Sequence, residues 1–323
     1  MSMSIGVDVG NYDTKTQHTT MPSGFSVYAA KPRLDKDYLF YEGRYYLPSM
    51  TRIEYVKDKT ENDQCLILTL FGIAREIIYQ ANDKLAKDGI KEPSDKDLQE
   101  YADEIRIIKL GVGLPVGDFS ILEPKTKQYY VDRLSGGVEF TYRDISFNLS
   151  VEKCVVFPQD ILPVCGNPEC GIVNDYSKYV IIGIGGQTVD IVPIIGGKPA
   201  VDKCISDRRG VRNMFSGIIG MLDNNFGTTI GEDTVDDVLR GRKTPLPDEM
   251  VQAINNYAEN HAGELLNICA TKNINFIEYP VVFFGGGSLL LRPFLEECQQ
   301  LKKFEFIEDV NGNAKYYASY AGK

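Results

Sequence analysis

The sequence predicts an α/β fold built from two similar halves, and three observations carry that prediction. Short apolar runs alternate with longer amphipathic stretches along the chain, as they do in βαβ units. The length of 323 residues allows about two domains, each large enough to bury its own core. A strand, a glycine-containing turn and a second strand are expected twice, in Ile5–Gln17 and in Val180–Val192. We therefore expect a duplicated fold whose halves face a central cleft.

The expected strands are short runs rich in β-branched and apolar residues. The expected helices repeat apolar residues at helical spacing, as Leu66, Leu70 and Ile73 do. In chain order, the strands are Ser4–Val9, Thr14–Thr19, Ile105–Val112, Ile145–Val151, Lys178–Ile184, Thr188–Ile195 and Pro280–Phe284. The helices are Asp63–Asp83, Asp118–Leu134, Arg212–Phe226, Asp233–Leu239, Pro247–Ala270 and Leu289–Gln299.

The composition excludes several classes of protein. With 43% hydrophobic and 25% charged residues, the chain is typical of globular proteins and unlike disordered ones. No window approaches the roughly 18 uninterrupted apolar residues that a membrane span needs. The 35 basic and 45 acidic residues give a net charge of −10, which repels nucleic-acid phosphates. We therefore expect neither membrane insertion nor direct binding to nucleic acid.

The cysteines predict a reducing compartment. The chain has 7 of them, an odd number scattered without a disulfide-like spacing, and the first residues carry no basic and apolar leader. Cys165 and Cys170 are spaced like half of a metal site, but the chain has only 2 histidines and no second cysteine pair nearby. We expect a cytoplasmic protein without metal–thiolate chemistry.

The first glycine turn has the composition of an anion-binding site. In Asp8–Lys15, a tight turn exposes backbone N–H groups, and Gly10 permits the positive φ that such a nest requires. Asp8 at the strand end is suited to hold Mg²⁺ through water, and Lys15 to contact phosphates as a point charge. The alternative is an ordinary hairpin turn, which asparagine and aspartate beside glycine also favour.

Two further glycine segments follow. In Gly183–Asp190, two adjacent glycines allow close approach of a ligand and Thr188 offers a hydroxyl, although a Gly-Gly hairpin is the plain alternative. In Val281–Ser288, a buried strand passes through three glycines into a helix N-terminus, which suits a phosphate or the flat face of a nucleoside. Each segment alone is weak evidence, whereas three in this order predict a nucleotide site.

These segments resemble the actin–Hsp70–sugar kinase superfamily. The family's two phosphate hairpins correspond to Asp8–Lys15 and Ile182–Asp190. Its connecting segment corresponds to Val156–Gln159, and its nucleoside segment to Phe284–Ser288. The resemblance implies an actin-like ATPase fold, with two RNase H-like lobes and a nucleotide cleft between them. The Gly-Leu-Pro of Val112–Val116, the Ile191-Val192 pair after Thr188-Val189-Asp190, the compact length and the ending Ala318–Gly322 resemble the bacterial ParM/StbA plasmid-segregation branch.

The resemblance also implies roles for individual residues. Asp8 is similar to the aspartate that holds Mg²⁺ through water, and Gln159 to the side chain that orients the attacking water. Arg209 and Gly210 begin the segment that contacts ribose and base, where Arg209 or Arg212 would lie against the base. The remaining nucleotide-binding residues implied are Gly10, Asn11, Lys15, Gly185, Gly186, Gln187, Thr188, Gly285, Gly286, Gly287 and Ser288.

One position departs from the family pattern. The second hairpin usually begins with an aspartate that supports the Mg²⁺ water shell, and here Gly183 stands in that place. Asp190 lies seven residues on, and nothing in the sequence shows that it substitutes. Because the metal shell lacks a carboxylate, we expect nucleotide binding to be intact and turnover to be slow.

The resemblance places lobe I at residues 1–160, with an inserted subdomain at about 30–60. It places lobe II at residues 161–323, with an insertion at about 222–272. These boundaries are expectations from sequence.

The implied function is a filament-forming actin-like ATPase or GTPase. It would polymerise head to tail with ATP or GTP and Mg²⁺ and segregate plasmid DNA, and hydrolysis would destabilise the filament. A small DNA-binding adaptor of the ParR type would link the filament to DNA, which agrees with the acidic charge. Two alternatives stay open: a small-molecule kinase of the sugar-kinase type, and a nucleotide-binding scaffold with vestigial hydrolysis.

Overall fold

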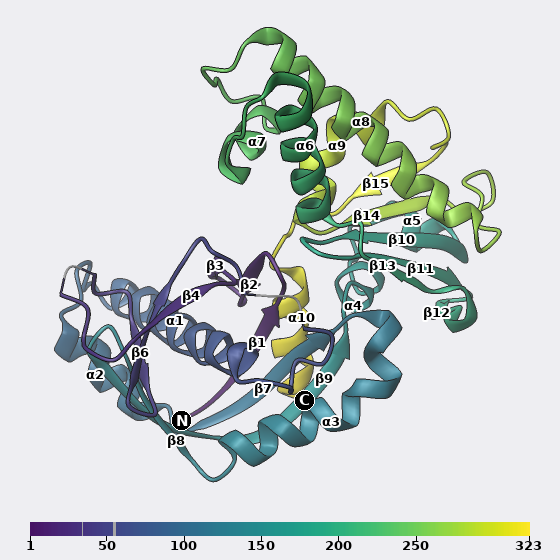
Figure 1. Cartoon of the computed structure of the whole chain (residues 1–323). Helices are drawn as coiled ribbons and strands as arrows, with labels where there is room; N and C mark the ends of the chain where they lie inside the picture. Colours follow the sequence, from purple (N-terminus) through teal and green to yellow (C-terminus); the bar gives the residue numbers. More distant parts are fainter. Residues whose placement is uncertain (34, 54–55) are drawn as a thin grey trace. The chain divides into compact units, whose positions relative to one another are not determined.

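The computed structural model describes residues 1–33, 35–53 and 56–323, and these form two compact units (Figure 1). Unit 1 comprises Met1–Gln159 together with Asn311–Lys323, and unit 2 comprises Asp160–Val310. The segment Asn311–Lys323 was expected in lobe II, but it packs with unit 1. Residues 34, 54 and 55, within the insertion predicted at about 30–60, lie outside the described residues.

Among its described residues, unit 1 holds a nine-stranded sheet in the order β3-β2-β1-β7-β9-β8-β5-β6-β4. At its centre β1 runs parallel to β7, and β7 parallel to β9, while the outer pairs are antiparallel. The strands are β1 (Ser2–Val9), β2 (Asp13–Lys15), β3 (Thr20–Pro22), β4 (Phe25–Tyr28), β5 (Leu39–Tyr41), β6 (Arg44–Pro48), β7 (Ile107–Leu114), β8 (Val138–Tyr142) and β9 (Ile145–Pro158).

Four helices pack on this sheet within the described part of unit 1: α1 (Gln64–Lys87), α2 (Asp95–Glu104), α3 (Val116–Leu134) and α10 (Gly312–Ala321). Helices α1 and α10 cover opposite faces of β1, because successive residues of a strand point to opposite sides. A Cβ on Gly72 of α1 would stand 3.0 Å from Val7, whereas a Cβ on Gly6 would overlap the carbonyl of Ala314 in α10.

The helix α10 lies directly on the backbone of the central strands, beside β1 and β7 (Figure 1). A Cβ on Gly111 would stand 2.7 Å from the Cβ of Tyr317, and Gly113 faces the ring of the same tyrosine. Tyr317 is fully buried and stacks on Phe157 of β9, with ring centroids 5.2 Å apart. Glycines at three strand positions therefore let the helix approach more closely than side chains would allow.

Unit 2 holds a five-stranded path β12-β11-β10-β14-β15, with β13 paired to β11, in the residues that the structure describes. Strand β10 runs parallel to β14 and antiparallel to β11. The strands are β10 (Lys178–Ile184), β11 (Val189–Ile195), β12 (Lys198–Pro199), β13 (Ile205–Asp207), β14 (Val281–Phe284) and β15 (Phe304–Phe306). The helices are α4 (Ile161–Cys165), α5 (Gly171–Asp175), η1 (Val201–Lys203), α6 (Val211–Phe226), α7 (Glu232–Leu239), α8 (Asp248–Ala270) and α9 (Gly286–Glu296).

Most expected elements appear within a few residues of their predicted limits, and the differences have local causes. The strand expected over Thr14–Thr19 is wrong beyond Lys15, because Thr16 N donates to Thr19 O and closes a turn. The prediction missed α2, whose capping box at Ser94 and Asp97 starts a helix with a single buried residue, Ala102. It also missed α10, whose glycine and tyrosine content does not favour helix.

The contact between α10 and β1 predicts a stability effect. Replacing Gly6 with alanine forces a Cβ onto the Ala314 carbonyl, so we expect the free energy of unfolding to fall by about 1–3 kcal/mol or more. Gly136, which has nothing within 4 Å of its hypothetical Cβ, provides the control. Urea unfolding of Gly6→Ala and Gly136→Ala measures both, and equal midpoints would contradict the packing described here.

Candidate functional site

The first glycine turn is a tight hairpin between β1 and β2. Asp8 pairs with Lys15 and Val9 with Thr14, and Gly10 N donates to Asp13 O at 3.1 Å. A Cβ on Gly10 would stand 2.8 Å from that same oxygen, so the turn requires glycine.

The second glycine turn, between β10 and β11, has the same register. Gly183 pairs with Asp190 and Ile184 with Val189, and Gly185 N donates to Thr188 O at 2.9 Å. Positions 8 and 183 are therefore equivalent in the two hairpins, as are positions 10 and 185. Each unit contains one copy of this hairpin.

Asp8 is held by two neutral amides. Its carboxylate is buried; Oδ1 accepts from Gln159 Nε2 at 2.7 Å and Oδ2 accepts from Asn313 Nδ2 at 3.2 Å. Gln159 follows β9, and its backbone N donates to Leu114 O. Both donors are uncharged, and a carboxylate accepts about four hydrogen bonds, so the Asp8 carboxylate has further acceptor capacity. The sequence did not indicate Asn313, since only the return of α10 to unit 1 brings it here.

Two lysines flank this hairpin. Lys15 lies on β2 opposite Asp8 and is half-buried, and Asn11 lies in the turn itself. Lys59, which the sequence analysis did not single out, donates from Nζ to Val9 O at 2.7 Å and to Gly113 O at 3.1 Å. Its ammonium thus joins the carboxyl ends of β1 and β7 and brings positive charge to the sheet edge where the hairpin lies.

The carbonyl groups of the second hairpin bind the N-terminus of α6. The backbone N–H groups of residues 210, 211 and 212 donate to the carbonyls of residues 187, 185 and 186, at 3.1, 3.1 and 2.8 Å. Gly210 is required there, because a Cβ would stand 2.5 Å from the carbonyl carbon of Gln187. The hairpin residues Gly185–Thr188 are therefore fixed by the helix that follows Arg209.

The turn before α6 is held by charge and by a buried histidine. Arg209 binds the Asp207 carboxylate through Nε at 2.8 Å and through its terminal nitrogen at 3.0 Å. This guanidinium lowers the pKa of Asp207. His261 of α8 is buried and donates from Nε2 to Arg209 O at 3.0 Å, and burial lowers the pKa of its imidazole. Arg209 is thus anchored at both its backbone and its guanidinium.

The third glycine segment begins α9. Gly285 is the N-cap at φ +92°, and Ser288 donates from Oγ to its carbonyl at 2.7 Å. A Cβ on Gly287 would stand 2.6–2.7 Å from Ile184 and Val211, so this glycine serves packing. Gly286 has nothing within 4 Å of its hypothetical Cβ. Only Gly286 therefore leaves open space at the helix N-terminus.

The carboxylate of Asp160 lies where a side chain at position 183 would stand. An ideal Cβ on Gly183 would overlap its Oδ2 and be 2.7 Å from its Cγ. Asp190, the register partner of Gly183, is buried, and its Oδ2 accepts from the Thr188 hydroxyl at 3.2 Å. Sequence reasoning did not indicate Asp160.

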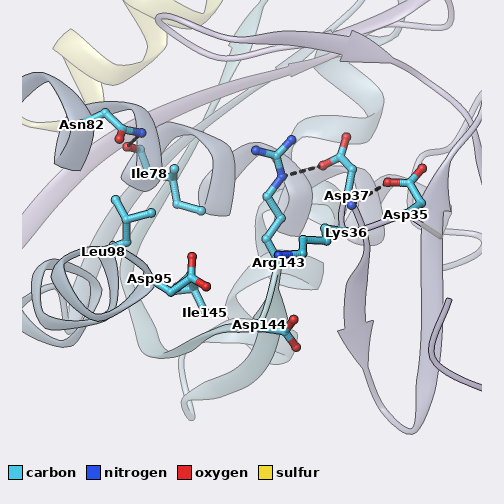
Figure 2. Close-up of a pocket in the computed structure, with 10 residues that line it drawn as sticks. All are labelled: Asp35, Lys36, Asp37, Ile78, Asn82, Asp95, Leu98, Arg143, Asp144 and Ile145. Atoms are coloured by element: carbon cyan, nitrogen blue, oxygen red, sulfur yellow. Dashed lines mark hydrogen bonds and ion pairs between the residues drawn. The ribbon is translucent and has the colours of Figure 1, made fainter. Parts of the chain in front are cut away.

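A cavity of about 440 Å³ lies in unit 1, and none of its lining residues belongs to either hairpin (Figure 2). Two of its acidic residues pair with basic side chains: Asp37 with Arg143 and Arg75, and Asp144 with Lys31. None of the predicted site residues lines it. The lining residues are Asp35, Lys36, Asp37, Ile78, Asn82, Asp95, Leu98, Arg143, Asp144 and Ile145.

The described ranges contain no group of three or more histidine, cysteine, aspartate or glutamate side chains arranged to hold a metal ion. A cation bound at Asp8 would therefore take one or two carboxylates, with waters and ligand oxygens completing its shell, as Mg²⁺ does. None of the helices in the described part of the chain has the length and apolarity of a membrane span.

Comparison with known proteins identifies the fold. The family description "archaeal actin homologue MreB-like, C-terminal" matches residues 181–297. No curated protein matches the sequence. Among solved structures, the archaeal actin homologue Ta0583 is similar, with a TM-score of 0.72, 16% identity and 99% of both chains covered. Its complex with ADP gives a TM-score of 0.70, also at 16% identity and 99% of both chains.

Two ParM structures are similar as well. A non-polymerisable quadruple mutant of pCBH ParM has a TM-score of 0.72 and 14% identity over 100% of this chain and 99% of that one. A 15-stranded ParM filament from Clostridium botulinum has a TM-score of 0.64 and 16% identity, with the same coverage. The expected α/β fold of actin-like, ParM-type proteins is therefore confirmed.

The buried histidine predicts a pH effect on stability. Because burial lowers the His261 pKa, the unfolded chain binds a proton more readily than the folded one. The free energy of unfolding should then fall as the pH drops through the unfolded value of about 6.5, and level off below the folded pKa. In His261→Gln, which keeps an N–H donor towards Arg209, this part of the pH dependence should disappear. Urea unfolding between about pH 8 and 5 measures it, and the same pH profile in both proteins would refute the effect.

Proposed function

We propose that the chain is a nucleotide-dependent, filament-forming actin-like ATPase or GTPase. The observation that carries this proposal is the repeated hairpin: one copy lies in each unit, with the same register and the same glycine at its turn. The actin-like fold supports it, since a ParM filament and an ADP complex of Ta0583 are among the similar structures.

The bound nucleotide is proposed to be ATP or GTP. Most of the residues that would contact it lie in the glycine-containing turns. Gly10, Asn11 and Lys15 of the first hairpin, and Gly185 to Thr188 of the second, would contact phosphates. Arg209, Gly210 and the segment Gly285–Ser288 would contact the nucleoside. The open space at Gly286 supports this assignment, because packing explains Gly285 and Gly287 but leaves that glycine unexplained.

Hydrolysis is proposed to depend on Gln159 and Asp8. The Gln159 side chain donates from Nε2 to Asp8, and this hydrogen bond fixes its orientation. Its Oε1 is not used in this bond and would accept a hydrogen bond from the attacking water. Asp8 would hold Mg²⁺ through water, since its charge is not neutralised by its two amide donors. The metal, when bound, would neutralise charge on the phosphate oxygens.

The filament is proposed to form by head-to-tail contact between identical chains in the cytoplasm, since a heterologous contact that does not close builds a helix. Segregation of plasmid DNA would then need a small DNA-binding adaptor of the ParR type. The net charge of −10 supports an indirect link, because the chain itself repels DNA.

A sedimentation and light-scattering assay tests the function. With Mg²⁺ and ATP, GTP, ADP or no nucleotide, we expect assembly above a critical concentration only with a triphosphate, followed by decay as hydrolysis proceeds. Nucleotide binding without assembly would contradict the filament, and phosphate transfer to an added small molecule would favour a kinase.

Gly286→Leu tests the nucleoside segment. The new side chain enters open space, and leucine favours helix over glycine, so we expect unchanged or higher stability with at least a tenfold loss of nucleotide affinity. Gly287→Ala is the matched comparison, since its Cβ meets Ile184 and Val211 and should lower stability instead. Calorimetric titration with ADP and urea unfolding separate the two effects; nucleotide binding by Gly286→Leu at full affinity would argue against the assignment.

Gln159→Ala tests the hydrolytic role. We expect nucleotide affinity within a few-fold of the unaltered chain, hydrolysis slower by about 10²-fold, and filaments that persist longer. Phosphate release in a single turnover measures the rate. An unchanged rate would remove Gln159 from the mechanism.

A further inference from the structure

The two hairpins differ at one equivalent position. Position 8 carries a carboxylate in the first hairpin, and position 183 carries none in the second, although both residues occupy the same place in the register. The chain therefore repeats the hairpin backbone without repeating this acidic side chain.

Asp160 supplies a carboxylate at that place from another part of unit 2. A Cβ built on Gly183 would overlap its Oδ2, and would be 2.7 Å from its Cγ and 3.3 Å from its Cβ. Glycine at 183 and aspartate at 160 are thus mutually required, because a side chain at 183 and the carboxylate of Asp160 cannot occupy the same space.

Asp160 is the N-cap of α4 and has a left-handed backbone, with φ +67° and ψ −19°. Aspartate adopts this conformation more readily than most residues with a side chain, although less readily than glycine. Its side chain does not cap α4.

We propose that Asp160 is the metal-facing carboxylate of the second hairpin and replaces the one that Gly183 lacks. This role rests on the proposed nucleotide binding. The carboxylate of Asp160 would face the hydrated divalent cation that accompanies the nucleotide. The carboxylate of Asp160 lies at Gly183, the position in the second hairpin that is equivalent to Asp8 in the first, and this supports the role. The slow turnover expected from Gly183 does not follow from this arrangement.

An exchange of the two residues tests the proposal without relying on turnover. The variants are Asp160→Gly, Gly183→Asp and the double exchange D160G/G183D. Nucleotide affinity is measured by calorimetry with ADP, in excess Mg²⁺ and in EDTA. Binding of Mn²⁺ to the ADP complex is measured by electron paramagnetic resonance, and stability by urea unfolding.

Asp160→Gly should bind ADP in EDTA like the unaltered chain, while its gain in affinity from Mg²⁺ and its Mn²⁺ affinity fall about tenfold. Gly183→Asp should unfold at lower urea, since two carboxylates compete for one space. The double exchange should recover both the urea midpoint and the metal affinity. Asp160→Asn, which keeps the shape, should lose metal affinity without a change in fold.

Asn273→Gly is the matched control for backbone strain, because Asn273 also has a positive φ, +55°, in unit 2. It should leave the metal dependence unchanged. Full Mg²⁺ dependence in Asp160→Gly and Asp160→Asn, with the unaltered chain binding Mg²⁺ and ADP normally, would overturn the role of Asp160 alone. An unaltered chain that binds no nucleotide would overturn the proposed function and this role with it.

Discussion

The site in unit 1 depends on the direct contact between helix α10 and the backbones of β1 and β7. Three glycines at the contact, at positions 6, 111 and 113, present no strand side chain to the helix. The same contact places Asn313 on Asp8, so the packing of a helix fixes the orientation of a carboxylate. A change in this packing would be felt at Asp8, although the glycines themselves contact no functional group.

In unit 1, the hydrogen-bond donors to the buried carboxylate of Asp8 are uncharged amides. Asp8 accepts from two amides, whereas Lys59, at the ends of β1 and β7, binds backbone carbonyls. Pairing Asp8 with an ammonium would offset its charge, and leaving it without donors would make burial of the carboxylate costly. In the 440 Å³ cavity, by contrast, Asp37 pairs with the basic side chains of Arg75 and Arg143.

The sequence predicts those features that are local. Strand and helix periodicity predicts β10, α6 and α8 closely, and the glycine spacing predicts both hairpins, because register follows from the turn. Asn313, Lys59 and Asp160 escape sequence reasoning, since each reaches its place through contacts between segments distant in sequence. Gly183 is an example. In the sequence it indicates only that a carboxylate is missing, whereas the fold shows that the carboxylate of Asp160 lies where a side chain at position 183 would stand.

The order of the units along the chain has a consequence for synthesis. Unit 2 is continuous from Asp160 to Val310, but unit 1 needs Asn311–Lys323, which the ribosome makes after unit 2. At about 5–20 residues per second, the central strands β1 and β7 wait many seconds for the helix that covers their glycine face. Unit 2 can fold first, while unit 1 completes its core and its Asp8 cluster only once α10 has emerged. A nascent chain therefore cannot present a finished unit 1 to its neighbours on the same polysome.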